Sequence, residues 1–356
     1  METRGFTLCT DSRCASSLSS EMADQLDAVL VLSFGGPERP EDVMPFLENV
    51  TRGRGVPRER LLEVAENYAR LGGKSPINEQ CRSLIGALRT ELDEHGVKLP
   101  IYWGNRNWHP FLEETVRRMS ADGVRRALVF VTSAYGSYSA CRQYLEDLER
   151  AKAAVGGETP NFERLPHYCH MSGFIEPLIE RVLDAFAQLS EDRRTSAKLL
   201  FTAHSIPISM AQTSNYAGQL TEVARLVAQG VQHPEYRLVY QSRSGPPNQP
   251  WLEPDVRDAI RAEAQAGVKD VVVAPIGFIS DHMEVKFDLD TQARELAESL
   301  GLHMVRAATV GTHPKFVAMI RELIEGRLSG AREACAWPCT ETCCPMPLHA
   351  GRPVAR

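Results

Sequence analysis

DAVLVLSFGGP (residues 27–37) and KLLFTAHSIP (residues 198–207) decide the fold. Each is an apolar run that ends in a turn rich in small residues and proline. Continuous apolar runs of this length are typical of strands that a parallel sheet buries on both faces. Because the two stretches resemble each other, we predict that the chain consists of two similar halves.

Further apolar runs lie outward from these two stretches. Strands are predicted at residues 100–104, 126–133, 237–242, 270–276 and 303–308. Between them, apolar residues recur at helical spacing, for example at Val43, Phe46, Leu47 and Val50. Strands that alternate with amphipathic helices predict an α/β fold with parallel sheets flanked by helices.

The predicted organisation has five parts. They are an N-terminal extension expected to be disordered (1–26), an N-terminal α/β lobe (27–172), a C-terminal α/β lobe (173–313), a helix that packs back on the body (314–330) and a cysteine-rich tail (331–356). The extension has no apolar core of the kind found in signal peptides. A start at Met22 or a transit peptide are the alternatives there.

Composition excludes several classes of function. Hydrophobic residues make up 43% and charged residues 24%, as in ordinary globular proteins. The formal charge of −6 argues against nucleic acid as a partner, and no apolar run is long enough to cross a membrane. Nine cysteines, an odd number, without a signal peptide favour reduced thiols and a cytoplasmic location.

Chemistry is expected after the strands, because ligands of open α/β sheets bind at the carboxyl ends of the strands. His204 ends one predicted strand, and Glu284 and Asp288 follow another, with His282 between that strand and Glu284. Because Glu284 and Asp288 are four residues apart, a helix there would stack both carboxylates on one face. Imidazole and carboxylate suit a divalent ion such as ferrous iron, and they also accept protons. Aromatic residues at the strand ends are expected to wall a flat ligand: Phe34, Trp108, Tyr135, Tyr138 and Phe278.

Five separated motifs resemble the ferrochelatases, specifically the actinobacterial type, over roughly residues 27–326. They are SFGGPERPEDVMPFLENV (33–50), GGKSPIN (72–78), FTAHSIP (201–207), QSRSGPPNQPWLEPD (241–255) and PIGFISDHMEV (275–285). The resemblance implies two similar Rossmann-like lobes, the chelatase fold, with a porphyrin in the cleft between them. It also implies an enzyme of haem biosynthesis, a lyase that inserts Fe²⁺ into a porphyrin.

The resemblance assigns roles to residues. His204 and Glu284 match the pair that handles iron. Apart from the resemblance, we expect Asp288 to relay protons outward. Ser75 and Tyr144 match the porphyrin-contacting serine and tyrosine of the family. Arg52 and Arg54, in TRGRG, resemble its propionate-binding segment.

One position departs from related Gram-positive enzymes, and the substrate stays open. Phe34 stands where those enzymes have a tyrosine, so no oxygen ligand is expected from that side. The actinobacterial resemblance implies coproporphyrin III as substrate and coproheme as product. Protoporphyrin IX, a non-catalytic porphyrin or haem carrier, and a cobalt or nickel chelatase are the alternatives. Enzymes of the haem pathway are candidate partners.

The tail adds a second metal hypothesis. Some ferrochelatases hold a [2Fe-2S] cluster through C-terminal cysteines and one body cysteine, and such a cluster needs four thiolates. The tail offers Cys335, Cys339 and either Cys343 or Cys344. Cys169 is the predicted fourth ligand and Cys141 the runner-up. A zinc site that draws on His167 or His170, or a tail without metal, are the alternatives.

Overall fold

Two parallel sheets with the same strand order form the framework of the computed structural model, which describes residues 26–245, 248–331 and 343–346. The first has the order β2-β1-β3-β4 and the second β6-β5-β7-β8, with every pairing parallel. The strands are β1 (Ala28–Ser33), β2 (Ile101–Asn105), β3 (Arg126–Val131), β4 (Asn161–Arg164), β5 (Lys198–His204), β6 (Tyr236–Gln241), β7 (Asp270–Ala274) and β8 (His303–Arg306). The predicted internal repeat is therefore confirmed.

All seven predicted strands are present, but the sequence analysis missed β4. This strand lies at the edge of its sheet, and its residues, NFER, are exposed or half-buried. An edge strand can remain polar because only one side of it is paired, so β4 has no apolar run to reveal it.

Helices cover both sheets. Those of the first half are η1 (Pro40–Asp42), α2 (Val43–Val50), α3 (Arg58–Arg70), α4 (Ile77–Glu94), α5 (Leu112–Ala121), η2 (Tyr138–Arg142) and α6 (Gln143–Val155). The others are α7 (Ser172–Ala187), α8 (Glu191–Arg194), α9 (Ile208–Gln212), α10 (Tyr216–Gly230), α11 (Val256–Gln265), η3 (Val285–Ala293), α12 (Arg294–Ser299) and α13 (Pro314–Leu328). Two of these segments, η2 and η3, are π-helices.

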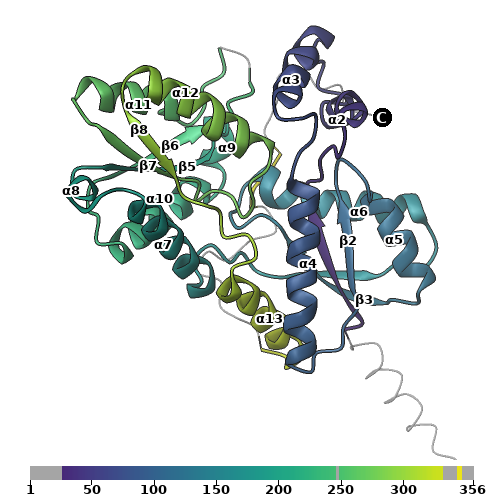
Figure 1. Cartoon of the computed structure of the whole chain (residues 1–356). Coiled ribbons are helices and arrows are strands. Elements are labelled where there is room, and N and C mark those ends of the chain that lie inside the picture. The colour runs from purple at the N-terminus through teal and green to yellow at the C-terminus, as the bar shows by residue number, and fades with distance from the viewer. Residues whose placement is uncertain (1–25, 246–247, 332–342, 347–356) are drawn as a thin grey trace, which may run out of the picture.

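The two halves lie side by side and share one core (Figure 1). The ring of Phe130 in β3 stacks on Tyr168 at 5.2 Å, and Phe174 of α7 and Phe316 of α13 pack against the same pair. Helix α13 thus returns from the second half to α7 and to α4 of the first half. The boundaries of the lobes at 27–172 and 173–313 stay predictions.

Helices α2 and α3 stand apart from the first sheet and reach the second half (Figure 1). Their apolar faces form a small cluster in which Phe46 and Tyr68 meet Met283 and Phe287 of the second half. No helix in the described residues is both long enough and apolar enough to span a bilayer. Residues 1–25 of the predicted N-terminal extension lie outside the described residues, as does most of the tail, whereas Leu26 is buried in the core.

Candidate active site

His204 is the last residue of β5, at the carboxyl end of the second sheet. The strand before it is buried, whereas the His204 side chain is 30% exposed. Its Nδ1 lies against the carbonyl oxygen of Ser205, and Tyr216 donates a hydrogen bond of 2.9 Å to the His204 carbonyl. Because a carbonyl oxygen only accepts hydrogen bonds, Nδ1 carries a proton, and Nε2 is the nitrogen left to bind another partner.

Glu284 reaches the same place from the helical turn that leads into η3, which follows the loop after β7. This loop passes close to β5 at Gly277, where a Cβ atom would lie 2.5 Å from that of Ala203. A glycine is therefore required there. Nε2 of His204 and Oε1 of Glu284 lie 3.5 Å apart, and the Glu284 side chain is 46% exposed. The structure thus brings together the two residues that the sequence analysis named for iron.

The two groups shift each other's pKa. Burial lowers the pKa of His204, but the charge and hydrogen bond of Glu284 outweigh it and raise the pKa to about 9. Burial raises the pKa of Glu284, and His204 outweighs it in turn, so that the pKa falls to about 2. At neutral pH the pair is therefore an imidazolium beside a carboxylate.

Asp288 lies near the pair, on η3. The sequence predicted a helix that stacks Glu284 and Asp288 on one face, and the helix found is a π-helix. Residues four and five apart are neighbours in this geometry, and π-helical turns are frequent at functional sites. Burial and the Glu284 charge raise the pKa of Asp288 to about 6, although Ser242 donates a hydrogen bond to its carboxylate. Asp288 can therefore exchange protons close to neutral pH.

Two tyrosines and a second histidine near Glu284 complete the polar surroundings. Burial and the Glu284 charge raise the pKa of Tyr68 and Tyr216, so both hydroxyls stay protonated. Burial lowers the pKa of His282, whose Nδ1 accepts a hydrogen bond of 3.1 Å from the Glu284 backbone. The sequence analysis missed both tyrosines, because each belongs to the apolar stripe of a helix and follows no strand.

Phe34 follows β1, in the first half, and its side chain is among the exposed large hydrophobic groups at 37%. Its ring lies edge-on to Phe46 at 6.3 Å, and the Arg106 guanidinium lies 5.9 Å from its centre. The same guanidinium covers the ring of Tyr144 at 4.4 Å and pairs with Asp147. Tyr144 is 4% exposed, and its predicted contact with a porphyrin stays a prediction.

Ser75 lies beside the turn that follows β1. Its backbone N–H donates to the Pro37 carbonyl at 2.8 Å, and a Cβ atom at Gly36 would lie 2.9 Å from that of Ser75. The missing side chain at Gly36 thus allows the two loops to touch. Arg52 and Arg54 are exposed in the loop between α2 and α3. Their predicted role in propionate binding stays untested.

The expectation that Tyr135 walls a flat ligand is wrong. Tyr135 is 1% exposed, packs edge-on against Phe174 and Tyr216, and donates a hydrogen bond of 2.8 Å to the Ile276 carbonyl. It belongs to the core that joins the two halves. Tyr138 is also buried, with its hydroxyl donating to Glu146 at 3.0 Å.

The cysteines can be compared only in part, since Cys335 and Cys339 lie outside the described residues. Cys169 is buried in the shared core. Cys141 is also buried, and Nη1 of Arg164 donates to its sulfur at 2.7 Å. Arg142, next to Cys141, donates a hydrogen bond of 3.0 Å to the carbonyl of Cys343.

Within the described ranges, no three His, Cys, Asp or Glu side chains form a metal-binding group. The Arg164 guanidinium, which donates to Cys141, lies near the His167 ring as well, with Nη2 2.9 Å from Nδ1.

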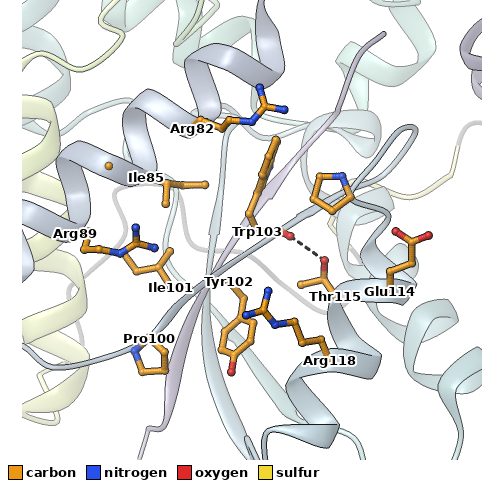
Figure 2. A pocket seen from close by; sticks show the side chains of 12 residues that line it. Arg82, Ile85, Arg89, Pro100, Ile101, Tyr102, Trp103, Glu114, Thr115 and Arg118 are labelled. Atoms are coloured by element: carbon orange, nitrogen blue, oxygen red, sulfur yellow. Dashed lines mark hydrogen bonds between the residues drawn. The ribbon is translucent and has the colours of Figure 1, made fainter. Parts of the chain in front are cut away.

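A separate hollow of about 520 Å³ lies at the free edge of β2 (Figure 2). The side chains of Arg82, Arg89 and Arg118 surround it, and Arg82 covers the ring of Trp103 at 5.3 Å. None of the residues that line it belongs to the His204 and Glu284 site.

Comparisons with known proteins agree with the motifs. The family model described as Ferrochelatase matches residues 26–328. The coproporphyrin III ferrochelatase of Streptomyces coelicolor is 50% identical, over 94% of this chain and 96% of its own length. That of Nocardia farcinica is 48% identical over 92% and 99%, and the ferrochelatase of Rhodopirellula baltica 50% over 92% and 97%.

Among solved structures, the sirohydrochlorin chelatase SirB from Bacillus subtilis in complex with cobalt is similar in fold. The TM-score is 0.50, at 10% identity, and the match covers 86% of this chain and 97% of that one. At this identity the likeness concerns the fold alone. It agrees with two Rossmann-like lobes of the chelatase type.

Proposed function

Because the chain belongs to the ferrochelatase family, we propose that it inserts Fe²⁺ into coproporphyrin III to form coproheme. Ferrous iron enters the macrocycle and two pyrrole protons leave. One observation carries the proposal: Nε2 of His204 and Oε1 of Glu284 lie 3.5 Å apart at the carboxyl end of the second sheet. Nitrogen and oxygen donors in this arrangement suit a borderline divalent ion.

The protonation of the pair defines its part in the reaction. At neutral pH the Nε2 proton of His204 occupies the place that iron needs, because the pKa of His204 is raised to about 9. Iron therefore displaces this proton when it binds. As the metal passes from the pair into the macrocycle, His204 and Glu284 become free to accept the two pyrrole protons that leave.

Asp288 provides the next acceptor. Its pKa of about 6 is higher than that of Glu284 and lower than that of His204, so it takes up and loses protons near neutral pH. We propose that it passes protons from the pair toward solvent.

We propose that the porphyrin lies between the halves, with one face toward His204. Phe34, exposed at the end of β1, would contact the opposite face and supplies no oxygen to the metal. Ser75 and Tyr144 would line the first half, with Tyr144 held by Arg106. Arg52 and Arg54, on the exposed loop after α2, would pair with propionates.

One assay tests the proposed function. Anaerobic Fe²⁺ is mixed with the protein and either coproporphyrin III or protoporphyrin IX, and metalloporphyrin absorbance is followed. We expect turnover on both with a clear preference for coproporphyrin III. A preference for protoporphyrin IX would contradict the substrate. Tight binding of coproheme without uptake of iron into free porphyrin would identify a carrier.

We further propose that the tail binds a [2Fe-2S] cluster through Cys335, Cys339, either Cys343 or Cys344, and one body cysteine. Three thiolates from the tail and one from the body of the protein would hold the two irons. The sequence alone favours Cys169 as the body ligand. The bond from Arg142 to Cys343 now favours Cys141, and the Arg164 N–H at its sulfur would stabilise a thiolate there.

Cys141→Ser and Cys169→Ser variants, purified anaerobically, distinguish the two. We expect Cys141→Ser to lose the visible absorption, iron and acid-labile sulfide that Cys169→Ser retains, with Cys81→Ser as the buried-cysteine control. Zinc in place of iron and sulfide would contradict the cluster. A cytoplasmic location and contacts with other haem-pathway enzymes remain parts of the proposal that localisation and co-purification can test.

A further inference from the structure

One side-chain amide joins the two halves next to the candidate active site. The backbone N–H of Asp281 donates to Oε1 of Gln80 at 2.8 Å, and Nε2 of Gln80 donates to the Asp281 carbonyl at 2.9 Å. Gln80 lies in the first turn of α4, in the first half, whereas Asp281 precedes η3 in the second. Both backbone groups of one residue are thus bound by a single glutamine.

The Gln80 end of this link is fixed to the first sheet. Its neighbour Asn78 donates to the carbonyl of Gly36, after β1, at 3.2 Å and to that of His109, after β2, at 3.1 Å. Asn78 is fully buried, so its bond to Gly36 is shielded from water. The first turn of α4 therefore keeps a set position relative to the strand ends that carry Phe34.

The Asp281 end is fixed to the segment that carries Glu284. Arg306, at the end of β8, donates to both carboxylate oxygens of Asp281 at 3.1 and 3.0 Å and to Asp290 of η3 at 3.1 Å. Glu284 lies between these two aspartates in the sequence. Its carboxylate is therefore carried by a segment that Arg306 clamps at both ends and Gln80 ties to the first half.

We propose that Gln80 is a positioning residue for iron insertion: by holding Asp281 it sets Glu284 relative to a porphyrin bound against the first half. The inference rests on the proposed function. Gln80 acts through the backbone of Asp281 and touches no reacting atom. Small misplacements of a catalytic group cost rate even where binding of the substrate is kept.

The chemistry of the side chain gives a sharp variant. A carboxylate in Gln80→Glu keeps the size and still accepts from the Asp281 N–H, but it cannot donate to the Asp281 carbonyl. The carboxylate oxygen that replaces the amide nitrogen also faces the Asp281 carbonyl oxygen, and these two acceptors repel each other. Gln80→Ala removes both bonds. Glu295→Ala is the matched control, because it removes the exposed link between the halves that Arg70 and Glu295 form at 2.8 Å.

The test compares kcat for iron insertion with binding of metal-free coproporphyrin III, measured by absorption, in the unaltered full-length protein and the three variants. We expect Gln80→Glu and Gln80→Ala to lower kcat by about tenfold or more, and the porphyrin Kd to stay within about twofold. Glu295→Ala should match the unaltered protein in both measurements.

Unchanged kcat in both Gln80 variants would overturn the inference. So would a loss of kcat accompanied by an equal loss of porphyrin binding, since that result means a structural role. A loss in Glu295→Ala as large as in the Gln80 variants would also overturn it, because any link between the halves would then serve. Failure of the unaltered protein to insert iron is a separate result that concerns the proposed function.

Discussion

His204, the last residue of β5, and Glu284, in the helical turn that leads into η3 after β7, face each other with Nε2 and Oε1 3.5 Å apart. Strands β5 and β7 are neighbours in the second sheet, so the carboxyl ends of both reach the same edge. The raised pKa of the imidazole and the lowered pKa of the carboxylate follow from this proximity.

Replacement of His204 should abolish iron insertion and leave the fold intact. The side chain is partly exposed at a strand end, so little packing is lost in His204→Ala. We expect a loss of at least about 100-fold in kcat, since both the nitrogen donor and the proton acceptor disappear. Metalloporphyrin absorbance measures the rate and thermal unfolding the fold. His95→Ala, at an exposed helix end, is the control and should keep full activity.

The pKa of His204 depends on Glu284. Without the carboxylate, burial is the larger influence left, so in Glu284→Gln the pKa of His204 should fall from about 9 toward or below its ordinary value of about 6.5. An NMR titration of the imidazole measures this shift directly. A pKa that stays near 9 in the variant would show that the pair is not coupled as described.

Asp288 should cause the rate of iron insertion to fall on the acidic side of its pH profile. A protonated carboxyl accepts no proton, so activity is expected to fall as the pH drops through about 6, the pKa of Asp288, and to be higher above it. In Asp288→Asn this fall should vanish and the rate at higher pH should be lower. The pH profile of kcat checks both statements. Asp184→Asn, which alters an exposed carboxylate, should leave the profile unchanged.

Helix α13 should be essential for stability. The ring of Phe316 is fully buried against Phe130, Tyr168 and Phe174, so Phe316→Ala leaves a cavity in the shared core. We expect a loss of about 3 to 5 kcal/mol in the free energy of unfolding, measured with denaturant. Leu328→Ala, at the exposed end of the same helix, should change it by less than about 0.5 kcal/mol. Equal losses would contradict the packing of α13.

The sequence predicted the features that depend on apolar pattern and on strand ends. The repeat showed in DAVLVLSFGGP and KLLFTAHSIP, and the strand-end rule led to His204 and Glu284. The sequence analysis missed β4 because an edge strand can be polar and then shows no apolar run. Tyr135 followed a strand and was expected to contact a ligand, but the two halves pack around it, and no local pattern reveals packing between halves.

The link between Gln80 and Asp281 was also beyond sequence reasoning. In the sequence, Gln80 is an ordinary polar residue of a predicted helix. Its bonds to Asp281 depend on how the second half packs against the first. The π-helical form of η3 likewise depends on its surroundings, since its sequence predicts only a helix.

The central claim is that His204 and Glu284 together insert iron and accept the protons that leave. The most direct test follows metalloporphyrin absorbance and proton release at once, in weakly buffered anaerobic solution with a pH indicator, Fe²⁺ and coproporphyrin III. We predict two protons released for each iron inserted by the unaltered protein, and neither signal with His204→Ala. Iron insertion by His204→Ala at the unaltered rate would contradict the account.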